Sequence, residues 1–170
     1  METVIRIFGY MENFDYSFDG SIVCDLKSKD KYSAIDELIS RARVFRKLPN
    51  IESFKQAVYK REKEQSTAFG HGVAIAHGKS PLVQSLFIAL GISHEGIDFD
   101  APDGKPVKFL FLIANPPQMQ FEYLFAISAI ARIARSKAFR EALLSCSCID
   151  DVEEKLSAAF KALPNKRIAV

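Results

Sequence analysis

The stretch that most restricts the possible folds is residues 107–114, Val-Lys-Phe-Leu-Phe-Leu-Ile-Ala, which is apolar except for Lys108. A strand with one solvated face alternates apolar and polar side chains, whereas a strand buried on both faces does not. This stretch therefore predicts a central strand covered on both sides. Because helices are what cover both faces of such a sheet, we expect an α/β fold: a single domain with a central mixed sheet flanked by helices on both faces.

Apolar residues at helical spacing predict a helix over residues 31–45 and another that starts at the N-cap Asn50 and runs to about residue 65. Ile51, Phe54 and Val58 mark the inner face of the second helix. Shorter apolar runs predict three further strands, at residues 21–26, 73–77 and 85–92.

The last third of the chain, beyond Pro116-Pro117, has a helical pattern. Ser136 is expected to cap one helix, and Asp150 with Glu153 resembles a capping box that opens the last one. Turn residues between positions 94 and 105 predict a loop. The expected order is a strand, two helices, three or more strands, and then helices.

The 170 residues suffice for one domain with a real core. We expect that domain at 21–162, with an N-terminal extension at 1–20 and a loose tail at 163–170. A net charge of +2 favours neither nucleic acid nor a membrane surface as partner. No apolar run reaches the roughly 18 residues of a membrane span, and the start lacks a secretory pattern. We expect a cytoplasmic protein whose cysteines, Cys24, Cys146 and Cys148, are reduced thiols.

The segment from Arg61 to Ser80 runs from a helix end through a glycine-rich turn into a strand that stops at His77. Its sequence is Arg-Glu-Lys-Glu-Gln-Ser-Thr-Ala-Phe-Gly-His-Gly-Val-Ala-Ile-Ala-His-Gly-Lys-Ser. An imidazole held there can act as a nucleophile and carry a covalent group. A P-loop is excluded because five residues, instead of four, separate Gly72 from Gly78. The other interpretation of His77, a structural histidine beside an apolar strand, stays open on these residues alone.

Residues near His77 in the sequence can form an anion cradle. Arg61 supplies a guanidinium, Ser66 and Thr67 supply hydroxyls, and glycines at 70, 72 and 78 allow close backbone approach.

Three other ionisable groups receive no catalytic role. His71 would lie on the same side of an extended segment as His77, but no cluster of carboxylates or thiols completes a ligand set, so we expect no metal site. His94 is expected to be a solvated loop residue, and Glu62 to lie at a solvated helix end.

These residues resemble the active-site segment of enzyme IIA of the bacterial phosphoenolpyruvate phosphotransferase system, mannitol/fructose type. The family pattern runs from an acidic or amide residue, through an apolar-glycine pair, to Ala-apolar-Pro-His-Gly. Glu62, Phe69-Gly70 and residues 73–78 fall in that register. The resemblance covers about residues 21–160 and continues in the segments 96–101, 103–107 and 139–143.

The resemblance implies a phosphocarrier that needs no cofactor and no metal. His77 would accept a phosphoryl group from a histidine phosphocarrier protein, with Arg61 and Tyr123 in the catalytic site and Ser66, Thr67 and Gly78 binding the phosphoryl group. The recipient would be a permease domain or a downstream regulatory protein. The stand-alone form is similar to the nitrogen-regulatory branch of the family. The partner surface would be an apolar rim around His77.

Two positions depart from the family pattern. Ala76 stands where the family has proline, and Tyr123 stands where it has a second histidine. A phenol donates one hydrogen bond but does not become a cation. Two alternatives therefore remain open: a phosphorylation-incompetent relative that acts by binding proteins, and an interaction domain that shares only the fold.

Overall fold

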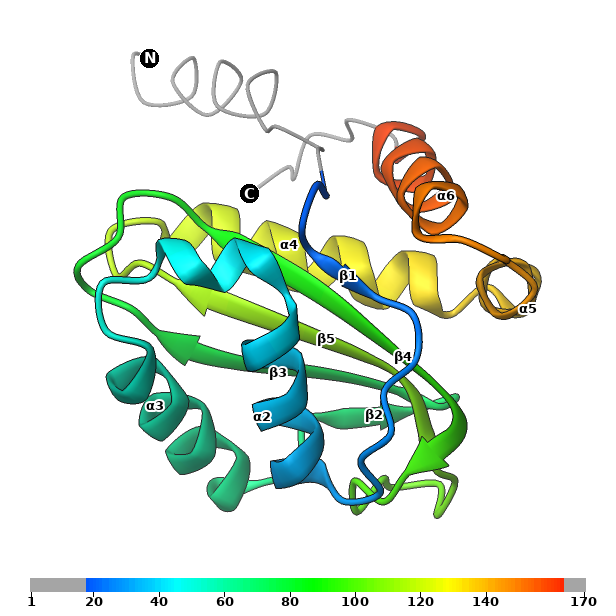
Figure 1. Ribbon diagram of the computed structural model, residues 1–170, viewed down its shortest axis with the longest axis horizontal. Helices are drawn as coiled ribbons and strands as arrows, with labels where there is room; N and C mark the ends of the chain where they lie inside the picture. Colours follow the sequence, from blue (N-terminus) through cyan, green and yellow to red (C-terminus); the bar gives the residue numbers. More distant parts are fainter. Residues whose placement is uncertain (1–17, 164–170) are drawn as a thin grey trace, which may run out of the picture.

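The computed structural model describes residues 18–163, which form one mixed sheet between two layers of helices (Figure 1). The elements before the long strands are β1 (Ile22–Val23), α2 (Lys31–Arg41), the 3-10 helix η1 (Arg43–Lys47) and α3 (Ile51–Glu64). The strands that follow are β2 (Ala68–Gly70), β3 (Val73–Lys79), β4 (Phe87–Ile97) and β5 (Val107–Asn115). The chain ends in α4 (Gln120–Ala134), α5 (Lys137–Leu144) and α6 (Ile149–Lys161).

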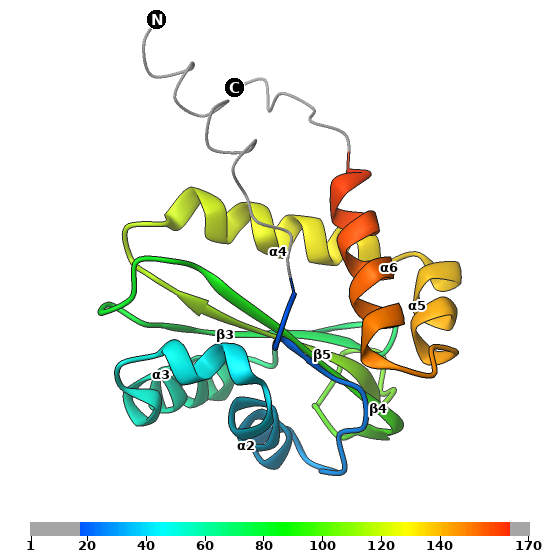
Figure 2. The ribbon, with the colours of Figure 1, turned by 45° about the horizontal axis from the view of Figure 1, so that its top comes forward.

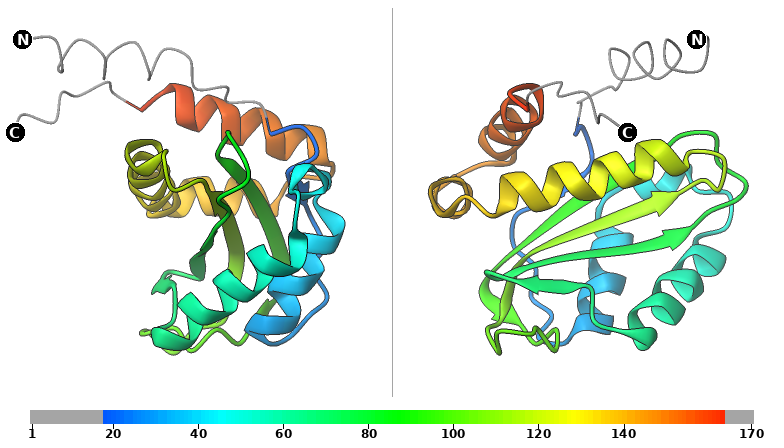
Figure 3. Two further views of the ribbon diagram at one scale, coloured as in Figure 1. Left: turned by 90° about the vertical axis from the view of Figure 1, so that its left-hand side faces the viewer. Right: turned by 180° about the vertical axis from the view of Figure 1, so that it is seen from behind.

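The sheet order is β1-β4-β5-β3-β2. β3 runs parallel to β5 and β1 parallel to β4, whereas β4–β5 and β2–β3 are antiparallel. The predicted central mixed sheet and the order of elements are therefore confirmed. Because β3 and β5 are parallel, both end at the same edge of the sheet, where α4 begins (Figure 3).

Two hydrophobic cores lie on opposite faces of the sheet. One is formed with α2, η1 and α3, and the other with α4, α5 and α6 (Figure 2). Along β5, Leu110 and Leu112 enter the first core, whereas Phe109, Phe111 and Ile113 enter the second. The near-continuous apolarity of this strand thus reflects burial on both faces, as predicted.

Two of the three predicted helix starts are confirmed. Asn50 Oδ1 accepts from Ser53 N at 2.9 Å, and Ser136 Oγ accepts from Phe139 N at 3.3 Å. The capping box at Asp150 is wrong, because α6 begins at Ile149 and its cap is Cys148, two residues before Asp150, with no side-chain bond. Glu153 instead accepts from the backbone nitrogen of Phe18.

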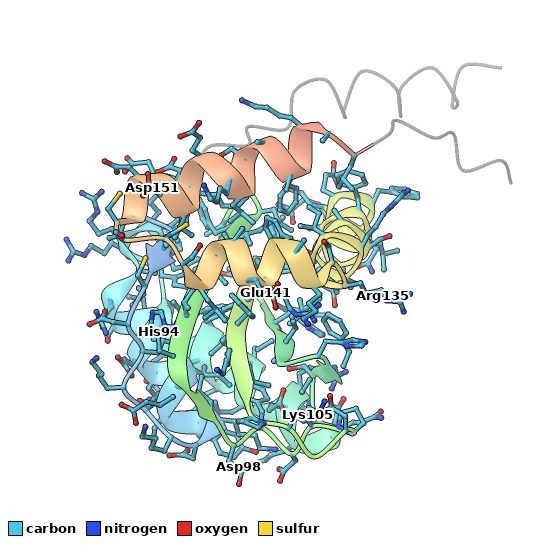
Figure 4. The ribbon with its side chains drawn as sticks, turned by 90° about the vertical axis from the view of Figure 1, so that its right-hand side faces the viewer. His94, Asp98, Lys105, Arg135, Glu141 and Asp151 are labelled. Carbon is cyan, nitrogen blue, oxygen red and sulfur yellow. The ribbon has the colours of Figure 1, made fainter. Side chains whose placement is uncertain are left out.

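Other predictions from the sequence differ from the structure. The first helix stops at Arg41, and η1 follows because Val44 N donates to Gly20 O instead of extending the α-helical ladder. Only the last part of the segment 94–105 is the expected loop. Strand β4 continues through a bulge to Ile97, so His94 is an exposed residue of that strand (Figure 4). Ile51, expected on the inner face of α3, is exposed.

The short edge strand β2 lies in what was expected to be a turn. His71, with φ of 58°, and Gly72, with φ of 74°, make the tight connection between β2 and β3. The proposed N-terminal extension and C-terminal tail fall almost entirely outside the described residues. Among residues 18–163, no helix is long and apolar enough to cross a membrane.

Candidate functional site

His77 lies near the end of β3, on the face of the sheet that α4 covers. Its neighbours on the same face, Val73 and Ile75, belong to the core beneath α4, whereas Ala74 and Ala76 pack toward α2 and α3. β2 pairs with β3 only at Val73 and Ala74. The strand edge beside His77 is therefore free of a pairing strand within the described residues, and the imidazole is half-buried.

The two ring nitrogens of His77 have different surroundings. Nδ1 lies 3.0 Å from the carbonyl oxygen of Ile75. A carbonyl oxygen only accepts hydrogen bonds, so the proton of the neutral ring belongs on Nδ1. This tautomer leaves the lone pair on Nε2, the nitrogen that is available to attack an electrophile.

Burial lowers the pKa of His77 below its ordinary value of 6.5. The bond to Ile75 raises the pKa, and the positive charge of Arg61 lowers it further. Burial is the largest of these effects, and the net result is a lower pKa. The imidazole is therefore neutral near pH 7, which is the form that a nucleophile requires.

Tyr123 lies against His77 from the first turns of α4. The two ring centroids are 5.5 Å apart, and the ring planes are tilted by 59°. Burial raises the pKa of the Tyr123 phenol, while Arg61 opposes that shift. The phenol therefore stays protonated and can donate a hydrogen bond beside the imidazole.

Arg61 belongs to the last turn of α3 and is half-buried. Its Nη1 donates to the backbone oxygen of Gln65 at 2.9 Å, which holds the guanidinium near the end of the helix. Its charge acts on both His77 and Tyr123. The structure thus brings together three residues that the sequence places on separate elements: Arg61 on α3, His77 on β3 and Tyr123 on α4.

Ser66 and Thr67 are occupied by other partners. Ser66 Oγ donates to Phe99 O and accepts from Ala68 N. Thr67 Oγ1 donates to Glu62 Oε2 at 2.6 Å. Both hydroxyls fix the connection between α3 and β2, in which Thr67 O accepts from Ile75 N of β3 at 3.2 Å.

Gly78 permits a close approach between β3 and α3. A Cβ atom at this position would lie 2.7 Å from Val58 Cγ2 and 2.9 Å from Val58 N. Such distances are shorter than van der Waals contact, so no larger residue fits without displacing the helix. Gly78 therefore sets how closely the α3 backbone approaches the strand that carries His77.

Glu62 is buried, contrary to the expectation of a solvated helix end. It is 1% exposed and accepts from both the backbone nitrogen and the hydroxyl of Thr67. Lys31 Nζ lies 3.7 Å from Glu62 Oε1 and 2.7 Å from Asp100 Oδ2. The spacing of Phe54, Val58 and Glu62 was a signal for burial, because residues four apart share one helix face.

Sequence reasoning also missed Asn115, the last residue of β5. Asn115 is 5% exposed, and among the described residues its Oδ1 is the one buried side-chain nitrogen or oxygen without a hydrogen-bond partner. Leaving such a group unpaired costs about 1–3 kcal/mol. A polar residue at the end of an apolar strand was the only signal in the sequence.

His71 does not share a surface with His77. It lies exposed in the β2–β3 turn, at the opposite end of β3, and its backbone nitrogen donates to Asp103 Oδ2 at 2.9 Å. The expectation that His71 and His77 lie on the same side of one extended segment was wrong, because the chain turns at Gly72. Within residues 18–163, no group of three or more histidine, cysteine, aspartate or glutamate side chains is placed to hold a metal ion.

Large apolar side chains are exposed on the two segments next to the site. Leu82, in the β3–β4 connection, is 71% exposed, and Phe121 and Leu124, on either side of Tyr123 in α4, are 76% and 53% exposed. We call Leu82, Phe121 and Leu124 the apolar rim. Exposed groups of this kind commonly mark a surface that contacts another protein.

The comparisons with known proteins agree with this arrangement. A sequence profile of the family described as "Phosphoenolpyruvate-dependent sugar phosphotransferase system, EIIA 2" matches residues 18–159. The fructose-specific EIIA component of Haloferax volcanii is 34% identical over 127 residues, which is 75% of this chain and 82% of that protein.

The fructose-specific EIIABC component of Bacillus subtilis is 31% identical over 132 residues, which is 78% of this chain but 21% of that much longer protein. Among solved structures, the nitrogen regulatory protein IIA-Ntr of Neisseria meningitidis superimposes with a TM-score of 0.74 at 31% identity. The superposition covers 81% of this chain and 93% of that protein. Since the profile spans most of its length, this chain belongs to the EIIA type 2 family of phosphoenolpyruvate-dependent sugar phosphotransferase systems.

Proposed function

We propose that the protein is a phosphocarrier or phosphorylation-dependent regulator that accepts a phosphoryl group on Nε2 of His77. The observation that carries this proposal is the bond between Nδ1 and Ile75 O, which directs the lone pair to Nε2 beside Arg61. The depressed pKa of His77 supports the same role, because it keeps the attacking ring neutral.

The donor in this proposal is a phosphohistidine of a histidine phosphocarrier protein. Nε2 of His77 attacks the phosphorus atom in line and forms a new N–P bond. The N–P bond of the donor breaks, and its electron pair stays on the donor imidazole. The recipient contributes mainly position and charge stabilisation to such a transfer.

Arg61 would bind the phosphoryl oxygens through its planar guanidinium, and Tyr123 would donate one neutral hydrogen bond. Ser66, Thr67 and Gly78 would support the phosphoryl group less directly. Because both hydroxyls already hold the α3–β2 connection, we assign them to positioning Arg61. Gly78 would keep α3, and with it Arg61, close to β3.

The apolar rim would receive the donor and then the recipient. The Bacillus subtilis relative is named as an EIIABC component, which supports a permease-linked EIIB as one recipient. The similarity to IIA-Ntr supports a regulatory partner as the other. The three free thiols are consistent with a reducing compartment, and we place this exchange in the cytoplasm.

Intact-mass analysis tests the proposal directly. The protein is incubated with phosphoenolpyruvate, enzyme I and the histidine phosphocarrier protein, alongside His77→Ala. The exposed histidine variant His94→Ala serves as the matched control. We expect an acid-labile gain of one phosphoryl group in the parent and in His94→Ala, and none in His77→Ala. The same gain in His77→Ala would overturn the proposal.

A second candidate function is that of a phosphorylation-incompetent regulator that acts by protein binding. The contact of His77 with Tyr123, where the family has a histidine, favours this candidate. If the parent gains no mass while the donor proteins are shown to be active, this candidate replaces the first.

A further inference from the structure

The buried oxygen of Asn115 distinguishes this residue from the other buried polar side chains. Glu62 Oε1 and Oε2 accept from Thr67, and Ser93 Oγ accepts from Gly96 N at 3.0 Å. Asn115 Oδ1 has no such donor among the described residues. An apolar side chain of similar size would fill the same space without an unpaired polar atom, so packing alone does not account for asparagine.

The sheet register places Asn115 on the same face as His77. His77 pairs with Ile113 on the neighbouring parallel strand, and Asn115 lies two residues beyond Ile113, opposite Lys79. Alternate residues of a strand point to the same side. Since Ile113 packs in the core beneath α4, Asn115 and His77 both face α4, one pleat apart.

The helix that follows Asn115 in the chain carries Tyr123. α4 begins five residues after Asn115, at the edge where β3 and β5 end (Figure 3). Tyr123, in its first turns, contacts the His77 ring. Asn115, whose Oδ1 is unpaired, therefore lies at the sheet edge near which α4 begins and Tyr123 meets His77.

A carboxamide offers two N–H donors and one acceptor oxygen. Its terminal torsion is broad and roughly two-fold, so the group can present either end to its surroundings. A phosphoryl group needs donors. In the resting site these are Arg61 and the phenol of Tyr123, which supplies a single hydrogen.

We propose that Asn115 is a further phosphoryl-binding residue, whose side-chain NH₂ donates to an oxygen of the phosphoryl group on His77. This inference rests on the proposed function, because it requires phosphorylation of His77. Because phosphoryl oxygens accept hydrogen bonds and cannot donate to Oδ1, this role requires the carboxamide to turn over and present its NH₂ group. No covalent bond to Asn115 forms or breaks.

The test compares Asn115→Val and Asn115→Asp with the parent and with Ser93→Ala. Ser93 is the matched control, because it is buried, polar and satisfied by Gly96. Each protein is phosphorylated by the phosphocarrier donor and, separately, by phosphoramidate, a small chemical donor. The measured quantities are the phosphohistidine lifetime and the thermal midpoint of the resting protein.

We expect the phosphohistidine lifetime of Asn115→Val to fall roughly tenfold, as for the loss of one hydrogen bond to a charged group. Its thermal midpoint should rise, because the unpaired atom is gone. Asn115→Asp should shorten the lifetime further, because a carboxylate repels the phosphoryl group. Ser93→Ala should lower the thermal midpoint and leave the lifetime unchanged.

An unchanged lifetime in Asn115→Val would overturn the inference while leaving the proposed function intact. Absence of phosphorylation in the parent with both donors would instead overturn the proposed function, and this inference with it. If Asn115→Val does not fold, the side-chain amide resonances of Asn115 in the parent decide the question. They should shift on phosphorylation, and unmoved resonances would reject the role.

Discussion

The imidazole of His77 and the phenol of Tyr123 lie with their ring centroids 5.5 Å apart and their planes tilted by 59°. The first ring lies near the end of β3 and the second in the first turn of α4, so the contact ties the nucleophile to the start of that helix. Its chemical consequence follows from the phenol, which can donate a hydrogen bond next to the imidazole but brings no positive charge.

Replacing Tyr123 by histidine should lengthen the lifetime of phosphohistidine at His77 or speed phosphoryl transfer, because a second imidazole can become a cation next to the phosphoryl group. Tyr123→Phe, which removes only the hydroxyl, should shorten that lifetime. Hydrolysis of the purified phosphoprotein, followed by intact mass, measures both variants. If neither variant differs from the parent in rate or lifetime, Tyr123 has no part in the site.

Removing Arg61 should affect transfer far more than folding. Arg61→Ala should slow phosphoryl acceptance by about 10- to 100-fold, the loss expected for a hydrogen bond to a charged group. The free energy of unfolding should fall by less than about 1 kcal/mol, because the side chain is only half-buried. Rapid-quench transfer and urea unfolding supply the two numbers. Losses of equal size in both would assign Arg61 to the fold instead of the site.

A fall in pH should affect both stability and phosphoryl acceptance through protonation of His77. Its folded-state pKa lies below the unfolded value of 6.5, so the unfolded chain binds more protons in the window between the two values. The stability contributed by the neutral ring is therefore complete above pH 6.5 and is lost as the pH falls through the folded pKa. Phosphoryl acceptance should be constant near neutrality and decline only below pH 6.5.

An NMR titration of the His77 ring measures that folded pKa. The midpoint should lie below 6.5 in the parent and should rise in Arg61→Ala, because the charge of Arg61 contributes to the depression. His94, which is exposed, serves as the internal reference. A midpoint that does not move in Arg61→Ala would show that Arg61 does not act on the ring.

The sequence predicted the layers of this fold because they follow from hydrophobic pattern. The unbroken apolar run ending at Ala114 required cover on both faces, and the two cores supply it. Helix starts at Asn50 and Ser136 were predictable from local capping chemistry. The end of the first helix was not, since it depends on the bond from Val44 N to Gly20 O, between residues far apart in the sequence.

The candidate site was predictable only where the local sequence pattern carries the information. His77 and Arg61 belong to one continuous segment whose spacing carries information, and Tyr123 was found only through resemblance to a family. Glu62 and Asn115 were missed because their burial depends on other elements: Glu62 lies against Lys31 and Thr67, and Asn115 ends a strand that is covered on both faces. From the charge and polarity of the sequence alone, the Glu62 side chain was expected to be exposed to solvent.

The buried carboxylate of Glu62 should be a main support of the fold near the site. Glu62→Ala should lower the free energy of unfolding by about 3 kcal/mol, the scale for breaking a buried ion pair, because Thr67 and Lys31 lose their shared partner. Glu64→Ala, an exposed glutamate of the same helix, is the control and should change stability little. Urea unfolding measures both, and equal effects would show that the burial of Glu62 does not matter energetically.

The apolar rim should be needed by a protein donor but not by a small chemical one. Phe121→Ser removes a ring that is 76% exposed, so folding should be nearly unaffected, while the affinity for the phosphocarrier protein should fall by about tenfold, as expected for losing one aromatic anchor. Phosphorylation by phosphoramidate should proceed at the parental rate, because this reagent needs no docking surface. Ile149→Ser, an exposed apolar residue at the start of α6, is the control and should leave both reactions unchanged. A parental rate with the protein donor would show that docking occurs elsewhere, whereas slower reaction with phosphoramidate would place Phe121 within the phosphoryl site itself.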